Sequence, residues 1–449
     1  MNKHVLALVA CLLGSAASAQ TTVDVSIEDA RVIATRALFA GDTALALQIA
    51  LRLLEADPND RAALLVVAAA APRLGDPKTG RRAGARAWAV SQTDVQKYEA
   101  ARLTALAAAN EERYTLATFW LRRALTVAPN PDEEAKTLRD AAGVRRINPW
   151  STRLGLSVVP SNNINGGATD ETLTAPGLPD GTLSPDALAL GGVRATLSFR
   201  TQYRLRATEK SRTTVALQYQ ASRVRLNDNV DVDVADSEFS TDATEMTLGY
   251  DRALETGSLG ASVTVGTFDF GGEDYFDFKR LALSRNVALS DTTGLQLSVQ
   301  REQQTYVSTG IGTVDRYVLR TSVSRKLASG NRVGTALTYT VSEGDSVNYT
   351  FDDWSIQGSY NWAEPFGPIS LGISGGIKWT DYPDYRLIAF VDGGREDVSV
   401  FYNLNIGFPD VSYAGFSPGL AISGSIAESN VSRFTRDTLS VALTVNSTF

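Results

Sequence analysis

From Trp150 to the end of the chain, apolar side chains recur at every second position in one segment after another. In residues 193–205 the odd positions are mostly apolar, whereas Arg194, Arg200 and Arg204 occupy even positions. Because successive side chains of a strand point to opposite faces, this period predicts strands with one apolar and one polar face. We expect fourteen of them, starting near residues 150, 191, 213, 238, 258, 275, 294, 314, 333, 349, 369, 396, 416 and 433.

The connections between these strands favour a membrane barrel over a soluble sandwich. Short polar turns such as ATEKSR and ASGNR alternate with connections of variable length, of which residues 161–190 form the longest. Outer-membrane barrels have short turns on the periplasmic side and longer loops outside. The last strand alternates up to a terminal Phe449, an ending by which such barrels are recognised for insertion. Outer-membrane lipid and the barrel assembly machinery are therefore expected partners.

The first nineteen residues have the pattern of a secretory signal peptide. Lys3 precedes an apolar run from Val5 to Leu13, and Ala17-Ser18-Ala19 offers a cleavage site. A lipobox at Leu8 to Cys11 is the competing interpretation, although its apolar run is short. The chain's one His and one Cys both lie in this segment. The exported chain therefore has no residues for His-dependent or Cys-dependent catalysis or for His and Cys metal sites, and we expect no enzyme activity and no cofactor.

Residues 20–147 are rich in Ala, Leu and Arg, which favours helices. Counting 34-residue frames from Ile27 places small residues, a glycine and a proline where a tetratricopeptide repeat has them, and frames from Arg61 and Tyr98 repeat the pattern more weakly. Alanine-rich helical hairpins without true repeats would look similar. Either array, of about six helices, would bind a peptide or protein on its concave face.

Three short motifs lie at the borders of the predicted barrel: Asn148-Pro149-Trp150, then Ser161-Asn162-Asn163-Ile164-Asn165 after the first strand, and Ser429-Asn430 before the last. They resemble motifs of the surface lipoprotein assembly modulator family. The resemblance covers the chain from residue 20 onward and implies a periplasmic tetratricopeptide-like domain (20–147) joined to a fourteen-stranded transmembrane barrel (148–449). This multidomain α + β fold would lie in the outer membrane of a Gram-negative bacterium. It would deliver client lipoproteins or secreted proteins to the cell surface.

The candidate site residues fall into two groups. The asparagine motif and Ser429-Asn430 are expected either to form tight turns at the barrel rim or to border the seam where the first and last strands meet. The candidate lumen residues are Arg194, Arg200, Arg204, Glu245, Glu302, Arg316 and Arg320. An acidic segment with Asp228, Asp231, Asp233 and Asp236 could offer oxygen ligands to calcium, but a solvated loop is the simpler expectation, so no metal site is assigned.

Three classes of function remain open at this point. The favoured one is an export component, in which the helical domain binds the client and the barrel conducts or releases it. A passive or solute-selective porin is the alternative, because a lumen of mixed charge is sufficient for it. An outer-membrane hydrolase without a His base is the third. With a net charge of −7, the chain is expected to bind no nucleic acid.

Overall fold

The computed structural model describes residues 25–227, 234–307, 310–411 and 416–447. The chain forms two compact units, residues 1–113 and 114–449, and each is described by itself. The second unit contains the last two helices together with all the strands.

Seven α-helices precede the strands in the described part of the chain. They are α1 (Ile27–Ala40), α2 (Thr43–Ala56), α3 (Arg61–Arg73), α4 (Pro77–Val90), α5 (Asp94–Asn110), α6 (Tyr114–Leu125) and α7 (Pro131–Ile147). Small residues at the expected positions are fully buried between helices, among them Ala34, Ala46, Ala50 and Ala87. Because these side chains are small, adjacent helices can approach closely, as the repeat frames required.

Local signals begin and end these helices. Asp42, Asp60 and Asp76 cap α2, α3 and α4 by accepting hydrogen bonds from backbone N–H groups of the first turn. Gly41 ends α1 in the left-handed conformation, with a φ of 87°. Within the described residues, no helix is long and apolar enough to cross a membrane.

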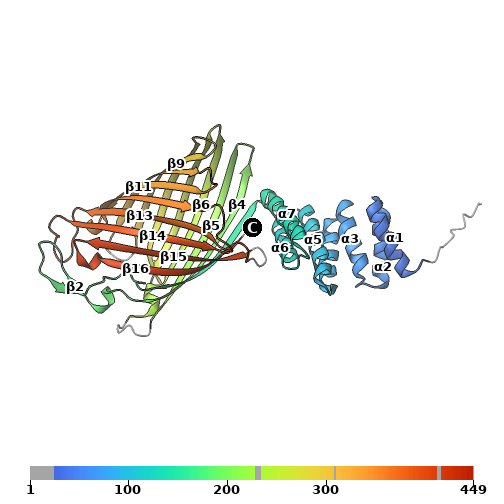
Figure 1. Ribbon diagram of the computed structural model, residues 1–449, viewed down its shortest axis with the longest axis horizontal. Coiled ribbons are helices and arrows are strands. Elements are labelled where there is room, and N and C mark those ends of the chain that lie inside the picture. The colour runs from blue at the N-terminus through green and yellow to red at the C-terminus, as the bar shows by residue number, and fades with distance from the viewer. Residues whose placement is uncertain (1–24, 228–233, 308–309, 412–415, 448–449) are drawn as a thin grey trace, which may run out of the picture. The chain divides into compact units, whose positions relative to one another are not determined.

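Fourteen antiparallel strands close into a barrel in the described residues (Figure 1). They are β1 (Trp150–Ser161), β4 (Gly192–Ala207), β5 (Ser211–Leu226), β6 (Thr241–Leu254), β7 (Gly257–Phe270), β8 (Glu273–Ala288), β9 (Thr293–Tyr306), β10 (Thr313–Lys326), β11 (Arg332–Gly344), β12 (Phe351–Asn361), β13 (Ser370–Tyr382), β14 (Arg395–Gly407), β15 (Phe416–Ser429) and β16 (Arg436–Ser447). Each strand pairs with its neighbour along the chain, and β1 closes the barrel against β16. Two short strands, β2 (Thr172–Leu173) and β3 (Gly181–Thr182), form a separate hairpin within the loop between β1 and β4.

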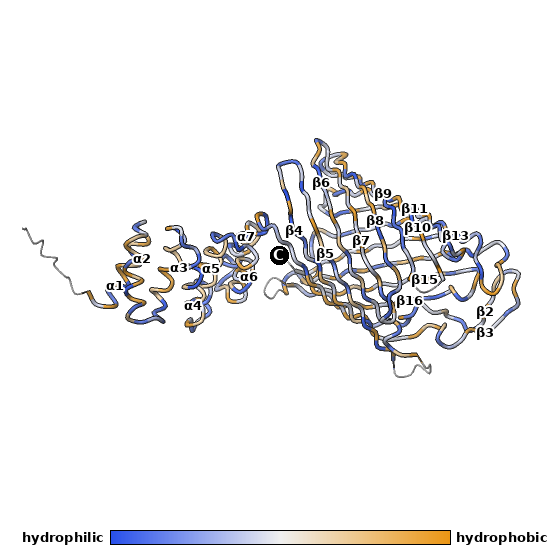
Figure 2. The backbone as a smooth tube through the Cα atoms, turned by 180° about the vertical axis from the view of Figure 1, so that it is seen from behind, coloured by the Kyte–Doolittle hydropathy of each residue, from blue (hydrophilic) through white to orange (hydrophobic). Residues whose placement is uncertain are grey.

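Hydrophobic and hydrophilic residues alternate along the barrel strands (Figure 2), and the aliphatic and aromatic side chains at alternate positions are exposed on the outer face. Examples are Leu156, Leu197, Leu217, Leu248, Val263, Leu281, Val299, Leu319, Leu337, Ile356, Ile373, Val400 and Leu443. The intervening positions face the lumen and are largely polar or charged. A closed ladder leaves no strand edge in lipid, and an apolar exterior is what a membrane requires of such a barrel.

The fold class predicted from the sequence is confirmed. All fourteen strands exist, and each begins within three residues of its predicted start. Two features were not predicted: α7 as a further helix, and the small β2–β3 hairpin. The proposed domain boundary between residues 147 and 148 stays a prediction.

Candidate functional site: the barrel seam and lumen

The seam between β1 and β16 is paired over only part of its length. Against β4, residues of β1 find ladder partners continuously from Trp150 to Ser161. Against β16, the ladder partners are Val158 with Leu443 and Ser161 with Ser440. We call the barrel end at Trp150 the proximal end and the end at Ser161 the distal end. The described ladder thus lies in the distal half of β1, and in its register Leu154 faces Ser447, where the described residues of β16 end.

Pro160 removes a backbone donor from this seam. Alternate residues of a strand direct their N–H groups to the same neighbouring strand. The backbone N–H of Asn162 donates to the carbonyl of Leu439 in β16 at 3.3 Å, so the nitrogen of Pro160 faces β16 as well. Proline has no N–H, and it is found in sheets where a ladder is incomplete. Pro160 therefore removes one possible backbone hydrogen bond from a seam that has few ladder pairs.

Beyond Ser161, where the backbone ladder ends, asparagine side chains form hydrogen bonds to β16. The side-chain Oδ1 of Asn162 accepts a hydrogen bond from the backbone N–H of Leu439 at 2.7 Å. The Nδ2 of Asn163, a residue that is only 6% exposed, donates to the carbonyls of Gly167 at 3.0 Å and Asp437 at 3.3 Å. Both asparagines therefore tie the loop after β1 to the start of β16.

Asn165 holds the two ends of that loop together. Its Nδ2 donates to the carbonyls of Asp186 and Leu188, at 2.9 Å and 2.7 Å, while its Oδ1 accepts from the backbone N–H of Leu190 at 3.0 Å. A Cβ atom on Gly167 would lie 2.1 Å from the carbonyl oxygen of Leu188, so only glycine fits there. The motif makes a tight turn at the rim and also borders the seam.

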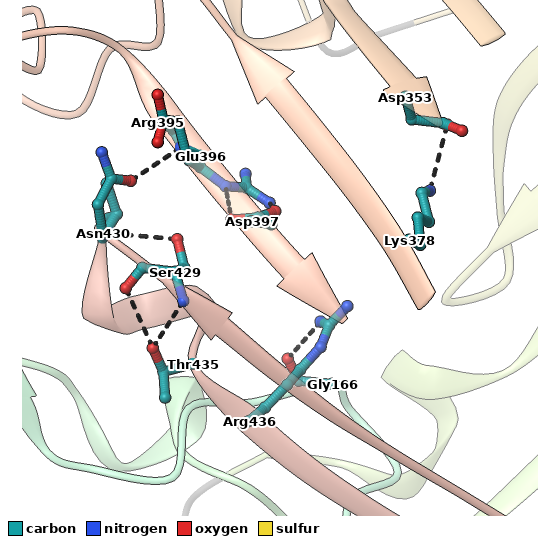
Figure 3. A network of polar contacts seen from close by, with 11 residues as sticks. Gly166, Asp353, Lys378, Arg395, Glu396, Asp397, Ser429, Asn430, Thr435 and Arg436 are labelled. Atoms are coloured by element: carbon teal, nitrogen blue, oxygen red, sulfur yellow. Dashed lines mark hydrogen bonds and ion pairs between the residues drawn. The ribbon is translucent and has the colours of Figure 1, made fainter. Parts of the chain in front are cut away.

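The second motif fixes the loop between β15 and β16 (Figure 3). Asn430 accepts a hydrogen bond from the backbone N–H of Glu396 at 2.9 Å and donates from Nδ2 to the carbonyl of Gly394 at 3.0 Å. The backbone N–H of Ser429 donates to Thr435 Oγ1 at 3.2 Å, which closes the turn. A guanidinium nitrogen of Arg436 donates to the carbonyl of Gly166 at 3.0 Å, which joins this loop to the first motif.

Further bonds cross directly between the two loops. The Oγ of Ser432 donates to the carbonyl of Thr172 at 2.7 Å and accepts from the backbone N–H of Thr174 at 2.8 Å. The backbone N–H of Thr169 donates to the carbonyl of Thr435 at 3.0 Å. We call this set of contacts between residues 162–190 and residues 429–437 the distal latch. It spans the seam at the end where the ladder is also formed.

An apolar cluster with one buried cation backs the distal latch. Tyr385 and Val391, from the loop between β13 and β14, pack with Ala175 and Val431. The guanidinium carbon of Arg395, a residue that is 9% exposed, lies 3.3 Å from the ring centre of Phe434, and the side chain pairs with Asp397 at 2.5 Å. Burial raises the pKa of the Tyr385 phenol.

At the proximal end, the helices of the same unit contact the strands on both sides of the seam. Arg204 of β4 donates to the carbonyl of Arg146 at the end of α7, at 3.0 Å, and also to the carbonyl of Asn148. The guanidinium carbon of Arg122 in α6 lies 4.8 Å from the ring centre of Phe416 in β15. Since β4 adjoins β1 and β15 adjoins β16, the pair α6–α7 bridges the strands that flank the seam.

Inside the barrel, acidic and basic side chains pair across neighbouring strands. Arg280 of β8 contacts Glu302 of β9 at 2.6 Å and Glu245 of β6 at 3.7 Å. Gln304 donates to Glu302 at 2.7 Å, and Lys378 pairs with Asp353 at 3.2 Å. Opposite charges therefore meet within the lumen, which gives it no single sign.

The remaining candidate lumen residues have varied surroundings. Arg194 donates to the carbonyl of Ile164 at 2.8 Å, and so joins β4 to the asparagine motif. Arg200 donates to Gln218 at 2.9 Å. Arg316 lies with its guanidinium carbon 5.8 Å from the ring centre of Phe351, and Arg320 pairs in register with Ser298 and Thr338. The structure does not gather these arginines into one site.

Three functional arginines were not predicted from the sequence: Arg436 in the distal latch, Arg395 in the apolar cluster behind it, and Arg280 in the lumen. Each lies in a strand of ordinary pattern, and no local pattern indicates its partner. Pro160 was the one detectable signal, because a proline within an otherwise regular strand indicates an interrupted ladder.

The structure assigns no metal site to the described residues, since no group of three or more His, Cys, Asp or Glu side chains there could hold an ion. Asp228, Asp231 and Asp233 of the acidic segment lie outside the described residues. Asp236 accepts a hydrogen bond from the backbone N–H of Leu226 at 2.8 Å. Phe449 also lies outside the described residues.

Residues 150–449 match the protein family described as surface lipoprotein assembly modifier. The match covers the whole barrel and two thirds of the chain. The chain belongs to this family. Membership confirms the resemblance drawn from the asparagine motifs and makes the closed barrel an outer-membrane β-barrel with a role in surface lipoprotein assembly. The family is described by an assembly role and not by a catalytic one.

Solved barrel structures have low sequence identity and low structural similarity to this chain. The OccAB3 protein of Acinetobacter baumannii is 11% identical, with a TM-score of 0.39 over 66% of this chain and 99% of its own. A BenF-like porin of Pseudomonas fluorescens is 10% identical, with a TM-score of 0.34 over 66% of this chain and 98% of its own. Likenesses at this level carry no inference about function. Comparison with curated proteins found no match.

Proposed function

We propose that this protein delivers lipoproteins to the cell surface by letting them leave the barrel wall sideways through the seam between β1 and β16. In this proposal the helical region lies in the periplasm and binds the client, and the barrel releases it into the outer leaflet. The single observation that carries the proposal is the seam: within the described residues β1 has two ladder pairs with β16, at Val158 and Ser161, against twelve consecutive pairs with β4.

A lipidated client has two parts with opposite requirements. Its acyl chains belong in the membrane, whereas its folded polar part belongs in water. A closed barrel would force the acyl chains through a polar lumen that contains Arg280, Glu302 and Lys378. An opening in the barrel wall lets the chains stay in lipid while the polar part passes through, so an incomplete seam suits this class of client.

The bridge formed by α6 and α7 supports a link between client binding and seam opening. The pair contacts β4 through Arg204 and β15 through Phe416, one strand away from the seam on each side. A movement of the helices on client binding would change the spacing of these two strands. The ladder at Val158 and Ser161 would then part, while the distal latch keeps the loops beyond it joined.

A passive porin remains the second candidate function, and the mixed charge of the lumen is the observation that favours it. The pairs Arg280–Glu302 and Lys378–Asp353 are compatible with solute passage. Porin activity, however, requires neither the helical region nor a weak seam.

A variant that loses the contacts of α6 and α7 with the strands distinguishes lipoprotein delivery from passive porin activity. We expect Arg204→Gln combined with Phe416→Leu to reduce display of a co-expressed surface lipoprotein at least fivefold, measured by protease shaving of intact cells. The matched control is Arg212→Gln, which removes a surface ion pair with Asp251 at the same barrel end. Both variants should show the heat-modifiable mobility of a folded barrel. Unchanged display in the bridge variant, with a folded barrel, would contradict the coupling.

A further inference from the structure

A groove on the outer face of the barrel, at β7 to β9, carries two cations beside aliphatic side chains. Val263, Leu281 and Arg301 lie in one row across these strands, and Lys279 and Gln303 lie in the next row toward the distal end. Together with the backbone of Arg280 they line an open groove of about 250 Å³. Val263 and Leu281 are 52% and 51% exposed, so the floor of the groove is apolar and faces lipid.

The position of Lys279 along β8 places it at a border of the membrane. On the outward face of this strand, Lys279 and Arg285 enclose Leu281 and Leu283. Six residues of a strand span roughly 20 Å. Given the strand tilt and the length of both side chains, this separation fits an apolar band of about 25 Å. Arg285 marks the proximal border, and Lys279 marks the distal one.

The two border cations differ in their partners. Arg285 donates to the carbonyls of Ser258 and Asn286, at 3.1 Å and 2.7 Å. Lys279 is exposed, and within the described residues it has no hydrogen-bond partner and no carboxylate within 4.0 Å of its Nζ. A lysine at the edge of a membrane without a protein counter-ion attracts an anionic head group.

Arg301 adds a second positive charge at the same place. Its guanidinium contacts Asp315 of β10 at 3.2 Å, yet its side chain stays 56% exposed. Its guanidinium carbon also lies 5.6 Å from the ring centre of Tyr317. Asp315 is the acidic group that faces this arginine, and Asp277 lies two residues farther along β8 from Lys279 toward the distal end. Asp315 is paired with Arg301, whereas Lys279 forms no ion pair within 4.0 Å in the described residues and is therefore available to an anionic ligand.

We propose that this groove binds the phosphorylated head group of lipid A, the lipid of the outer leaflet. Lys279 and Arg301 donate to a phosphate, Gln303 adds an amide at the rim, and the acyl chains lie against Val263 and Leu281. In the proposed topology, the distal end of the barrel faces the outside, so Lys279 and Arg301 lie at the level of the outer leaflet. This assignment of the lipid rests on that topology. The site is separate from the seam and holds a membrane lipid, not the client.

Native mass spectrometry of the full-length protein in detergent, titrated with lipid A, tests this site. We expect Lys279→Gln to weaken binding about fivefold, since one charge near a membrane surface contributes about this factor. Lys279→Glu should weaken binding further. The matched control is Arg325→Gln, an exposed cation on the outward face of β10 at the proximal end, and it should leave binding unchanged. Each variant is checked for heat-modifiable mobility.

Altered lipids distinguish the ligand chemistry. Lipid A without phosphates should bind wild-type protein more weakly than intact lipid A binds the Lys279→Gln variant, because it loses the contacts of both Lys279 and Arg301. Equal binding of intact and dephosphorylated lipid would overturn the phosphate site, and so would equal binding by wild type and Lys279→Glu. If phosphatidylglycerol bound as tightly as lipid A, the assignment to the outer-leaflet lipid would be wrong. The double variant Arg301→Gln/Asp315→Asn removes a neutral pair and should weaken binding if Arg301 contacts the phosphate.

Discussion

At the residue scale, the amide side chains of exposed Asn162 and buried Asn163 form hydrogen bonds across the distal end of the seam. Asn162 and Asn163 together bond Leu439, Gly167 and Asp437, groups on both sides of the junction. An amide offers two donors and an acceptor on one short side chain, so a single asparagine can satisfy several loop backbone groups at once. The polar motif is thereby explained in part by structure alone.

Replacing Asn163 with alanine should destabilise the distal latch. The carbonyls of Gly167 and Asp437 would lose the amide donor, and the backbone N–H of Gly167 would keep only its longer bond to Asn165 Oδ1, at 3.2 Å. Leaving such buried groups unsatisfied costs about 1–3 kcal/mol. We expect faster hydrogen exchange at residues 163–167 and a lower unfolding temperature of the barrel. Asn286→Ala, at an exposed amide of the proximal end, is the control and should show neither change.

The ion pair between Arg81 and Glu111 predicts a pH dependence for the helical region. The hydrogen bond from Arg81 lowers the pKa of Glu111 below its usual 4.5. A carboxylate with a lowered pKa in the folded state stabilises it above the unfolded pKa, and this contribution is lost as pH falls through the folded value. Glu111→Gln should therefore speed exchange in α4 and α5 at pH 7.

The effect of the same substitution should shrink as the pH falls through the folded pKa of Glu111, because the wild-type carboxylate is then protonated. Asp94→Asn is the control, because Asp94 lies 4.0 Å from Lys97 in an exposed pair. A difference between Glu111→Gln and wild type that stays constant throughout an acid titration of the folded protein would show that the charge of Glu111 is not the cause.

At the element scale, β1 and β16 differ from the other barrel strands because the edge that they share is incompletely paired. The two strands are equally long but offset, since Arg436–Ser447 faces residues 154–165 in this register. Pro160 contributes by removing a donor directed at β16. The strands elsewhere pair along nearly their whole length, with register shifts at Arg204 and Phe268.

Replacing Pro160 with valine restores a backbone N–H that faces β16. One added hydrogen bond stabilises the junction by about 0.5–1.5 kcal/mol. We expect slower hydrogen exchange at residues 158–162 and 439–443, and slower appearance of the client at the surface in pulse-labelled cells. Pro418→Val in β15, away from the seam ladder, should leave the rate of display unchanged. Faster display in the Pro160 variant would contradict the proposed role of this residue.

The strands could be predicted from the sequence, but the contacts between distant loops could not. Alternation located the strands because it follows directly from the geometry of a strand with lipid on one side. The distal latch depends on pairs such as Arg436 with Gly166 and Ser432 with Thr172, which are more than 250 residues apart. No local pattern encodes such a pair, and Arg395 beneath Phe434 is hidden for the same reason.

At the scale of the whole molecule, delivery from the periplasm to the cell surface requires one topology of the barrel. The distal loops must face the outside and the proximal turns the periplasm, so that the helical region meets clients before export. A protease site inserted between Pro179 and Asp180, both exposed, should be cleaved on intact cells. The same site between Glu255 and Thr256 should be cleaved only after the outer membrane is permeabilised. The reverse pattern would invert the orientation.

The central claim is that β1 and β16 must separate during delivery, and a reversible lock across the seam tests it most directly. Val158 and Leu443 are ladder partners, and paired Cα atoms of an antiparallel ladder lie about 4.5–5.5 Å apart, within reach of a disulfide. The chain's one cysteine, Cys11, lies in the expected signal segment, so the introduced bridge is unambiguous. A bridge between Val323→Cys and Thr335→Cys, ladder partners in β10 and β11, is the control. We predict that oxidation of the Val158→Cys/Leu443→Cys variant reduces client display at least tenfold and that a reductant restores it, whereas the control displays its client under both conditions. Unchanged display with the seam fully cross-linked would contradict release through the barrel wall.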